Sequence, residues 1–85
     1  MEFSEFLRNR HSIIHGAKKL KEVSVQQYNN RLTNMVAQKI YNEEEQLDET
    51  IVNKINAKYS NRANEYERTI NYYIEYKNHL KKRLV

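Results

Sequence analysis

Cysteine and proline are absent from these 85 residues, and glycine occurs once, at Gly16. Without cysteine, the chain can form neither a disulfide framework nor a thiolate metal site. Strands joined by tight turns need more glycine and proline than this, so we expect an all-α fold. The length predicts one domain over residues 1–85, and a chain this short has a small margin of stability.

Long apolar runs are also missing. No segment approaches the roughly 20 apolar residues that a membrane span requires. The first ten residues, MEFSEFLRNR, contain acids and no apolar run, so they do not have the pattern of a signal peptide. We therefore expect a cytoplasmic protein without membrane contact.

The net charge is +4, and its sign changes along the chain. Residues 1–40 carry seven Lys or Arg and three acids, residues 41–75 carry four and eight, and residues 76–85 carry four and none. This pattern favours a basic face and an acidic face in the folded domain. The alternative is that folding mixes the segments.

Hydrophobic spacing predicts four helices. The first begins near Glu2 and runs to about His15, with Gly16 as its stop. The second begins after Ser24 and ends at Ile40 or Tyr41. Asp48 is the expected N-cap of the third helix, and Ser60 or Asn61 that of the fourth, which we expect to reach Leu84.

The second helix has the clearest start signal. Ser24 and Gln27 form the capping-box pattern S-x-x-Q, and Val23 is placed to pack on Tyr28 as a hydrophobic staple. Apolar residues recur at helical spacing along one stripe, which we expect to be buried. They are Val25, Tyr28, Leu32, Met35 and Val36.

The opposite side of the same helix carries Gln27, Asn30, Arg31 and Asn34, and no acid. Amides and guanidinium groups pair with base edges in a DNA groove, whereas a carboxylate there would repel phosphate. This side is therefore a candidate for contact with nucleic acid. The alternative is an ordinary polar helix face, since such faces are often rich in amides.

A basic connection precedes this helix. Lys18, Lys19 and Lys21 lie just before Ser24, where a helix N-terminus offers unpaired N–H groups and the serine adds a hydroxyl. Together these groups predict contacts with phosphate. A solvated lysine cluster is the alternative.

Two tyrosines of the fourth helix, Tyr72 and Tyr76, lie off the stripe formed by Tyr66, Ile70 and Tyr73. A helix that is apolar on two sides usually has two neighbours. The second neighbour is either another helix of this domain or another protein, including a second copy of the chain.

Chemistry-bearing motifs are scarce. His11 and His15 have the spacing of a zinc pair but lack a third ligand, and Glu43 to Glu45 lack the alternation and the glycine of a calcium loop. The chain contains no cysteine nucleophile, no G-x-S-x-G and no glycine-rich phosphate loop. We expect no metal, no cofactor, no small-molecule substrate and no catalysis.

Two segments together resemble a known family. Ser24-x-x-x-Tyr28-x-x-x-Leu32 follows a basic connection and a helix with Phe-Leu, and Asn61-Arg-Ala-Asn-Glu-Tyr66 leads to Ile70-Asn-Tyr-Tyr73. This pattern resembles the N-terminal core-binding domain of tyrosine recombinases of the phage-integrase type, found in mobile elements.

The resemblance implies a compact four-helix bundle with a SAM-like fold that clamps one side of duplex DNA. It implies Ser24 at a phosphate, with Gln27 and Arg31 toward the groove. The recombinase catalytic domain has no counterpart here, so the domain would bind DNA without cutting it. The competing hypothesis is a protein–protein module, a homodimer or an adaptor, that uses Tyr72 and Tyr76.

Overall fold

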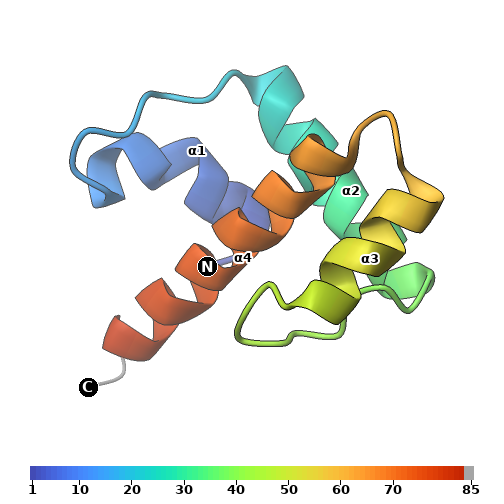
Figure 1. Cartoon of the computed structure of the whole chain (residues 1–85). Helices are drawn as coiled ribbons and strands as arrows, with labels where there is room; N and C mark the ends of the chain where they lie inside the picture. Colours follow the sequence, from blue (N-terminus) through green and yellow to red (C-terminus); the bar gives the residue numbers. More distant parts are fainter. Residues whose placement is uncertain (84–85) are drawn as a thin grey trace.

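One long helix supports the other three. The computed structural model describes residues 1–83. Its elements are α1 (Phe3–Ile13), α2 (Glu22–Ala37), α3 (Glu49–Lys58) and α4 (Ala63–Arg83). Helix α4 contacts each of the others, and α1 also contacts α2. In Figure 1, α4 passes diagonally between α1 and α3.

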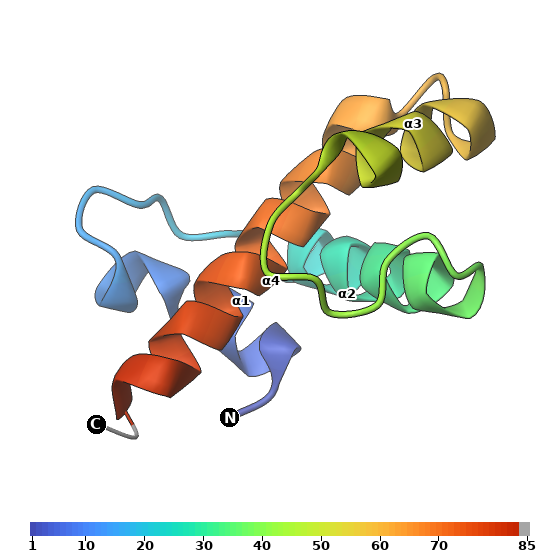
Figure 2. The ribbon, with the colours of Figure 1, turned by 60° about the horizontal axis from the view of Figure 1, so that its bottom comes forward.

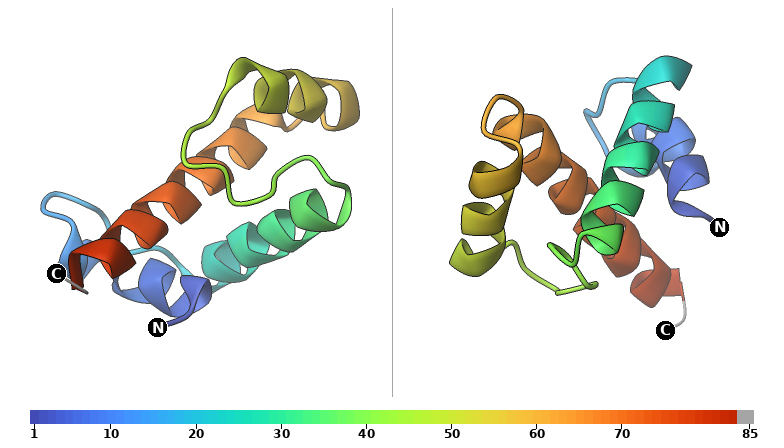
Figure 3. Two further views of the ribbon diagram at one scale, coloured as in Figure 1. Left: turned by 90° about the horizontal axis from the view of Figure 1, so that it is seen from below. Right: turned by 90° about the vertical axis from the view of Figure 1, so that its right-hand side faces the viewer.

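The arrangement confirms the predicted all-α class and the four helices over the described residues. The radius of gyration is 12.9 Å, close to the roughly 12 Å of a compact domain of this length. Figures 2 and 3 show α2 and α3 on neighbouring sides of α4. The N-terminus lies beside the C-terminal half of α4, where the Tyr76 hydroxyl donates a hydrogen bond to the Met1 carbonyl at 2.6 Å.

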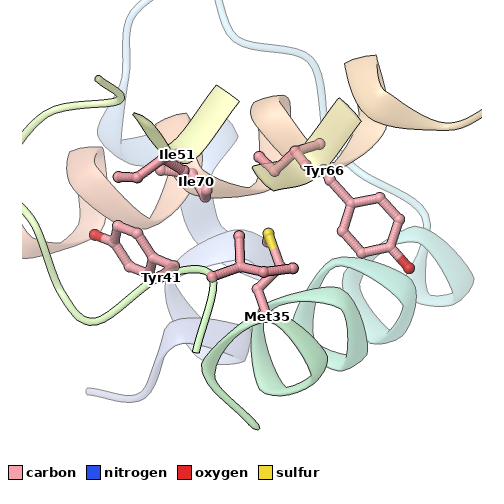
Figure 4. Packing of buried hydrophobic residues seen from close by; sticks show 7 residues of the cluster. Met35, Tyr41, Ile51, Tyr66 and Ile70 are labelled. Atoms are coloured by element: carbon pink, nitrogen blue, oxygen red, sulfur yellow. The ribbon is translucent and has the colours of Figure 1, made fainter. Parts of the chain in front are cut away.

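The first of two hydrophobic clusters lies between the end of α2, α3 and the first half of α4. Figure 4 shows Met35 of α2 pointing toward the side chains that α3 and α4 contribute. The rings of Tyr59 and Tyr66 stack beside it with centroids 3.8 Å apart. The buried members are Met35, Ile40, Tyr41, Ile51, Ile55, Tyr66 and Ile70.

The second cluster joins α1, the first half of α2 and the second half of α4. Its buried members are Phe3, Phe6, Leu7, Val25 and Tyr28. Helix α4 contributes half-buried tyrosines to this cluster and isoleucine and tyrosine to the first. Because α4 belongs to both clusters, it must be apolar on two sides, as its sequence is.

Several predicted boundaries shift. Helix α1 ends at Ile13, two residues before His15, and Gly16 lies in the turn beyond it with a φ of +84°. Helix α2 ends at Ala37 and not at Ile40 or Tyr41.

A left-handed residue causes the early end of α2. Lys39 has a φ of 59°, and the amide of Ile40 donates to the Met35 carbonyl at 2.9 Å while that of Lys39 donates to Val36 at 3.1 Å. These two bonds form a Schellman motif, which closes the helix and turns Ile40 back toward Met35 in the core.

The predicted N-cap is confirmed for α3 but not for α4. Asp48 is confirmed as an N-cap, since its Oδ1 accepts from the Ile51 amide at 2.9 Å. Helix α4 begins at Ala63, and the Arg62 carbonyl accepts from the Tyr66 amide at 3.2 Å, so Ser60 and Asn61 precede the cap position. The predicted end at Leu84 lies outside the described residues.

Candidate nucleic-acid interface

Helix α2 starts three residues earlier than its strongest sequence signal predicts, with Lys21 and not Ser24 at the N-cap position. It begins at Glu22, and the Lys21 carbonyl accepts from the Val25 amide at 3.0 Å. Ser24 therefore lies inside the first turn, and the predicted capping box is wrong. The predicted staple is also wrong, because Val23 is 58% exposed and leaves Tyr28 to pack elsewhere.

An ion pair explains the early start. Arg8 of α1 donates from Nε to both carboxylate oxygens of Glu22 at 3.0 Å and from Nη2 to Oε1 at 2.8 Å. A carboxylate is favoured in the first turn of a helix, so Glu22 serves the macrodipole and the Arg8 contact together. The hydrogen bond from Arg8 lowers the pKa of the Glu22 carboxyl and raises that of the guanidinium.

The amide-rich side of α2 is open to solvent. Gln27, Asn30 and Asn34 are all exposed, whereas Val25, Tyr28 and Met35 are buried on the other side. Glu22 is the one acid of this helix, and it is paired with Arg8 in the first turn. Val36, predicted to be buried, is 47% exposed and extends this outer side.

Arg31 does not belong to the open side. Its Nη2 donates to Glu65 Oε2 of α4 at 3.0 Å, and its side chain is only 13% exposed. The guanidinium carbon lies 5.4 Å from the centroid of the Tyr28 ring and 5.9 Å from that of Tyr66. The prediction that Arg31 is available to DNA is wrong for this arrangement, because the cation is held between α2 and α4.

The three predicted lysines remain available. Lys18, Lys19 and Lys21 are exposed in the connection between α1 and α2, and none takes part in the ion pairs found within residues 1–83. Lys19 and Lys21 line an open hollow of about 690 Å³. Ser24 is half-buried within the first turn of α2.

The hollow also brings in residues of α1 that the sequence did not predict for this surface. Arg8, Asn9 and His11 line it together with the lysines and with Glu22, whose carboxylate pairs with Arg8. Arg8 and His11 are three residues apart, so they share a face of α1, and that spacing was the available signal. The structure thus joins the lysines of the connection to a second set of donors.

Ion pairs correct the prediction of separate basic and acidic faces. Four pairs join a cation of the basic end segments to an acid of residues 41–75. They are Arg10–Glu75, Arg31–Glu65, Lys77–Glu43 and Lys81–Glu45. Folding therefore mixes the two signs at these positions.

The acidic connection lies along α4 and not along the open side of α2. Glu43 accepts from the Tyr73 hydroxyl at 2.7 Å and from Lys77 at 3.2 Å, and Glu45 accepts from Lys81 at 3.0 Å. These hydrogen bonds lower the pKa of both carboxyls. Their negative charge is balanced by α4, so it does not oppose an anion at α2.

Tyr72 and Tyr76 find their second neighbour within the domain. The Tyr72 ring meets Tyr28 edge to face at 5.0 Å, and the Arg10 guanidinium lies 4.6 Å from its centroid. The Tyr76 ring packs on Phe3 and Phe6, with ring centroids 5.7 and 5.6 Å apart. Both rings are half-buried, so the exposed tyrosine surface assumed for a protein interface is not present.

Over the described residues, no three His, Cys, Asp or Glu side chains gather as a metal site would require, and His11 and His15 are exposed. In the same part of the chain, every helix is too short or too polar to cross a bilayer.

The chain matches no protein-family model, no curated protein and no solved structure at a significant level. Its function is therefore inferred from the open side of α2 and the lysines that precede it.

Proposed function

We propose that this chain is a small, non-catalytic DNA-binding domain whose helix α2 lies against a groove of the duplex. Gln27, Asn30 and Asn34 project toward base edges. Lys18, Lys19 and Lys21 contact phosphates at the start of the helix, close to Ser24. The observation that carries the proposal is the continuity between an exposed helix side, whose one acid is paired, and three lysines that form no ion pair within residues 1–83.

The dimensions support this proposal. Helix α2 has 16 residues, which gives a length of about 24 Å at 1.5 Å per residue. The major groove of B-DNA is wide enough to admit an α-helix. Amide side chains form bidentate hydrogen bonds with adenine, and lysines bind phosphate as point charges. The expected DNA affinity is modest, because few phosphates would be neutralised.

The resemblance to recombinase core-binding domains is part of the same proposal. A SAM-like arrangement with the second helix at the duplex would give α2 the role described here. The proposal includes a cytoplasmic location, DNA as the partner and no cutting activity. The exclusion of Arg31 from the open side is the departure from what the resemblance implies.

Duplex binding measured against salt tests the proposal. Fluorescence anisotropy with a labelled duplex should show binding at low salt. A plot of the logarithm of the binding constant against the logarithm of the salt concentration should then have a slope of about −3. Replacing Lys18, Lys19 and Lys21 together by alanine should remove most of that slope.

A variant that removes two lysines elsewhere is the control for net charge, with the losses compared per charge removed. Lys54 and Lys58 are exposed on α3, away from the open side of α2, so Lys54→Ala with Lys58→Ala should leave the slope nearly unchanged. Amide shifts at Gln27, Asn30 and Asn34 should accompany binding. Absence of binding at low salt, or equal losses in the two sets of variants, would overturn the proposal.

A further inference from the structure

A second surface, separate from the open side of α2, lies between the ends of α1 and α4. Ile13 and Ile14 at the end of α1 face Glu75, His79 and Lys82 of α4 across a groove of about 470 Å³, with buried Phe6 at its base. No residue of α2 lines it. Figure 1 shows the last turns of α4 extending past α1 on this side.

The apolar character of the groove follows from how α1 ends. Phe6 belongs to the second hydrophobic cluster, and its ring packs beside the His79 ring with centroids 5.7 Å apart. Ile13 is the last helical residue and Ile14 is extended, so the chain leaves the helix before either side chain can be covered by a further turn. Both isoleucines remain half-buried beside an open groove.

The charge at the rim is positive. Glu75 is neutralised by Arg10, which donates to it at 2.9 and 3.1 Å. Lys82 is exposed and belongs to none of the ion pairs within the described part of the chain. Lys77 and Lys81 do not line the groove and are paired with Glu43 and Glu45, so Lys82 supplies the positive charge of the rim.

We propose that this groove docks an acidic amphipathic helix of a partner protein. Its apolar side chains, one helical turn apart, contact Ile13 and Ile14, and a carboxylate beside them pairs with Lys82. Grooves between two helices with an apolar base suit a helix with anchors at this spacing. The carboxylate of the partner supplies a negative charge opposite Lys82. Such complementary charge favours an acidic helix over a neutral or basic one.

A second copy of the chain fits less well. Its most acidic stretch, Glu43 to Glu45, already pairs with its own Lys77 and Lys81. Each copy would also present its own Lys82 at the rim of the same groove. Like charges brought together in this way oppose self-association.

Synthetic peptides test the proposal with the full chain. The probe is a 15-residue peptide with leucines one helical turn apart and glutamates flanking them. A second peptide has the same composition with the leucines out of helical register, and a third has lysine for glutamate. The first should shift the amides of Ile13, Ile14, His79 and Lys82, and bind at least about tenfold more tightly than the others.

Two variants locate the binding. Lys82→Glu reverses an exposed charge and should weaken the glutamate peptide by about fivefold, whereas the matched Lys54→Glu on α3 should not. Ile14→Ser should weaken it further, with folding checked by the amide spectrum. Equal binding of the peptide with misplaced leucines, shifts confined to other residues, or an unaffected Lys82→Glu variant would overturn the proposal. Concentration-dependent shifts of the same amides without peptide would do so too, by showing a second copy as the occupant.

Discussion

Arg31 of α2 and Glu65 of α4 form an ion pair at 3.0 Å that joins two helices and withdraws a cation from the proposed DNA surface. The tyrosine rings of Tyr28 and Tyr66 flank the guanidinium, so the arginine is both paired and packed. The carboxylate is 47% exposed while the arginine side chain is 13% exposed. The pair therefore has two effects: it stabilises the packing of α2 on α4, and it neutralises a positive charge at the edge of α2.

Replacing that carboxylate should separate the two effects. Glu65→Gln removes one negative charge beside α2 and leaves a partly buried guanidinium without its ionic partner. We expect a loss of about 1 kcal/mol in urea unfolding. We also expect tighter duplex binding with a salt slope steeper by up to about 1.

Glu67→Gln, on the same helix, is the control for net charge. It should not reproduce the steeper slope, because no ion pair of the described residues includes Glu67. Weaker duplex binding by Glu65→Gln, in a folded protein, would contradict the assignment of Arg31 as a restrained cation.

Lys39 is a site where a smaller residue should stabilise the domain. It has a φ of 59° in the Schellman motif that ends α2, and a side chain in this conformation costs about 1 kcal/mol relative to glycine. Lys39→Gly should therefore raise the free energy of unfolding by about that amount. The thermal midpoint should rise by about 4 to 8 °C.

The same exchange in a helix interior should have the opposite sign. Lys54 is exposed within α3, so Lys54→Gly should destabilise by nearly 1 kcal/mol, about the usual cost of glycine there. If both variants lose stability, the left-handed conformation of Lys39 is not what determines the end of α2.

Tyr72 should act as a packing residue and not as an intermolecular contact. Tyr72→Ala removes a ring that touches Tyr28 and Arg10, and for a half-buried ring we expect a loss of about 2 kcal/mol. Tyr72→Phe keeps the ring and should lose far less. Sedimentation should give the same mass for wild type and both variants, whereas a mass that halves without loss of stability would point to an interface between copies.

Stability should fall in acid for a reason tied to named carboxyls. Hydrogen bonds from Arg8, Tyr73 and Lys81 lower the pKa of Glu22, Glu43 and Glu45 below their ordinary value of 4.5. A carboxyl with a lowered folded pKa stabilises the protein above its unfolded pKa, and this contribution disappears as the pH falls through the folded value. The urea midpoint should therefore be constant from pH 7 to about 5 and decrease below that.

A double variant tests this pH dependence. Glu43→Gln with Glu45→Gln should be less stable than wild type at pH 7, and the difference should shrink as the pH falls through the lowered pKa values and the wild-type carboxyls become protonated. A difference that stays constant over this range would show that these two groups contribute through packing and not through charge.

Composition and local spacing were enough to predict the class of fold and part of the core. The absence of proline, the single glycine and the helical spacing of apolar residues predicted four helices, and Val25, Met35 and Ile70 are fully buried as their spacing indicated. Asp48 was also recognisable, because capping is a local interaction between a side chain and an amide three residues away.

Which polar groups remain available depends on how distant segments of the chain pack. The N-cap of α2 lies at Lys21 and not at Ser24, which places Glu22 in the first turn, where it pairs with Arg8, 14 residues earlier in the chain. Arg31 left the predicted open side because Glu65, 34 residues later, binds it, and Tyr72 turned inward because Tyr28 and Arg10 receive its ring. Helical periodicity gives the direction of a side chain relative to its own helix axis, whereas the partner it meets depends on how distant helices pack, and no local pattern records that.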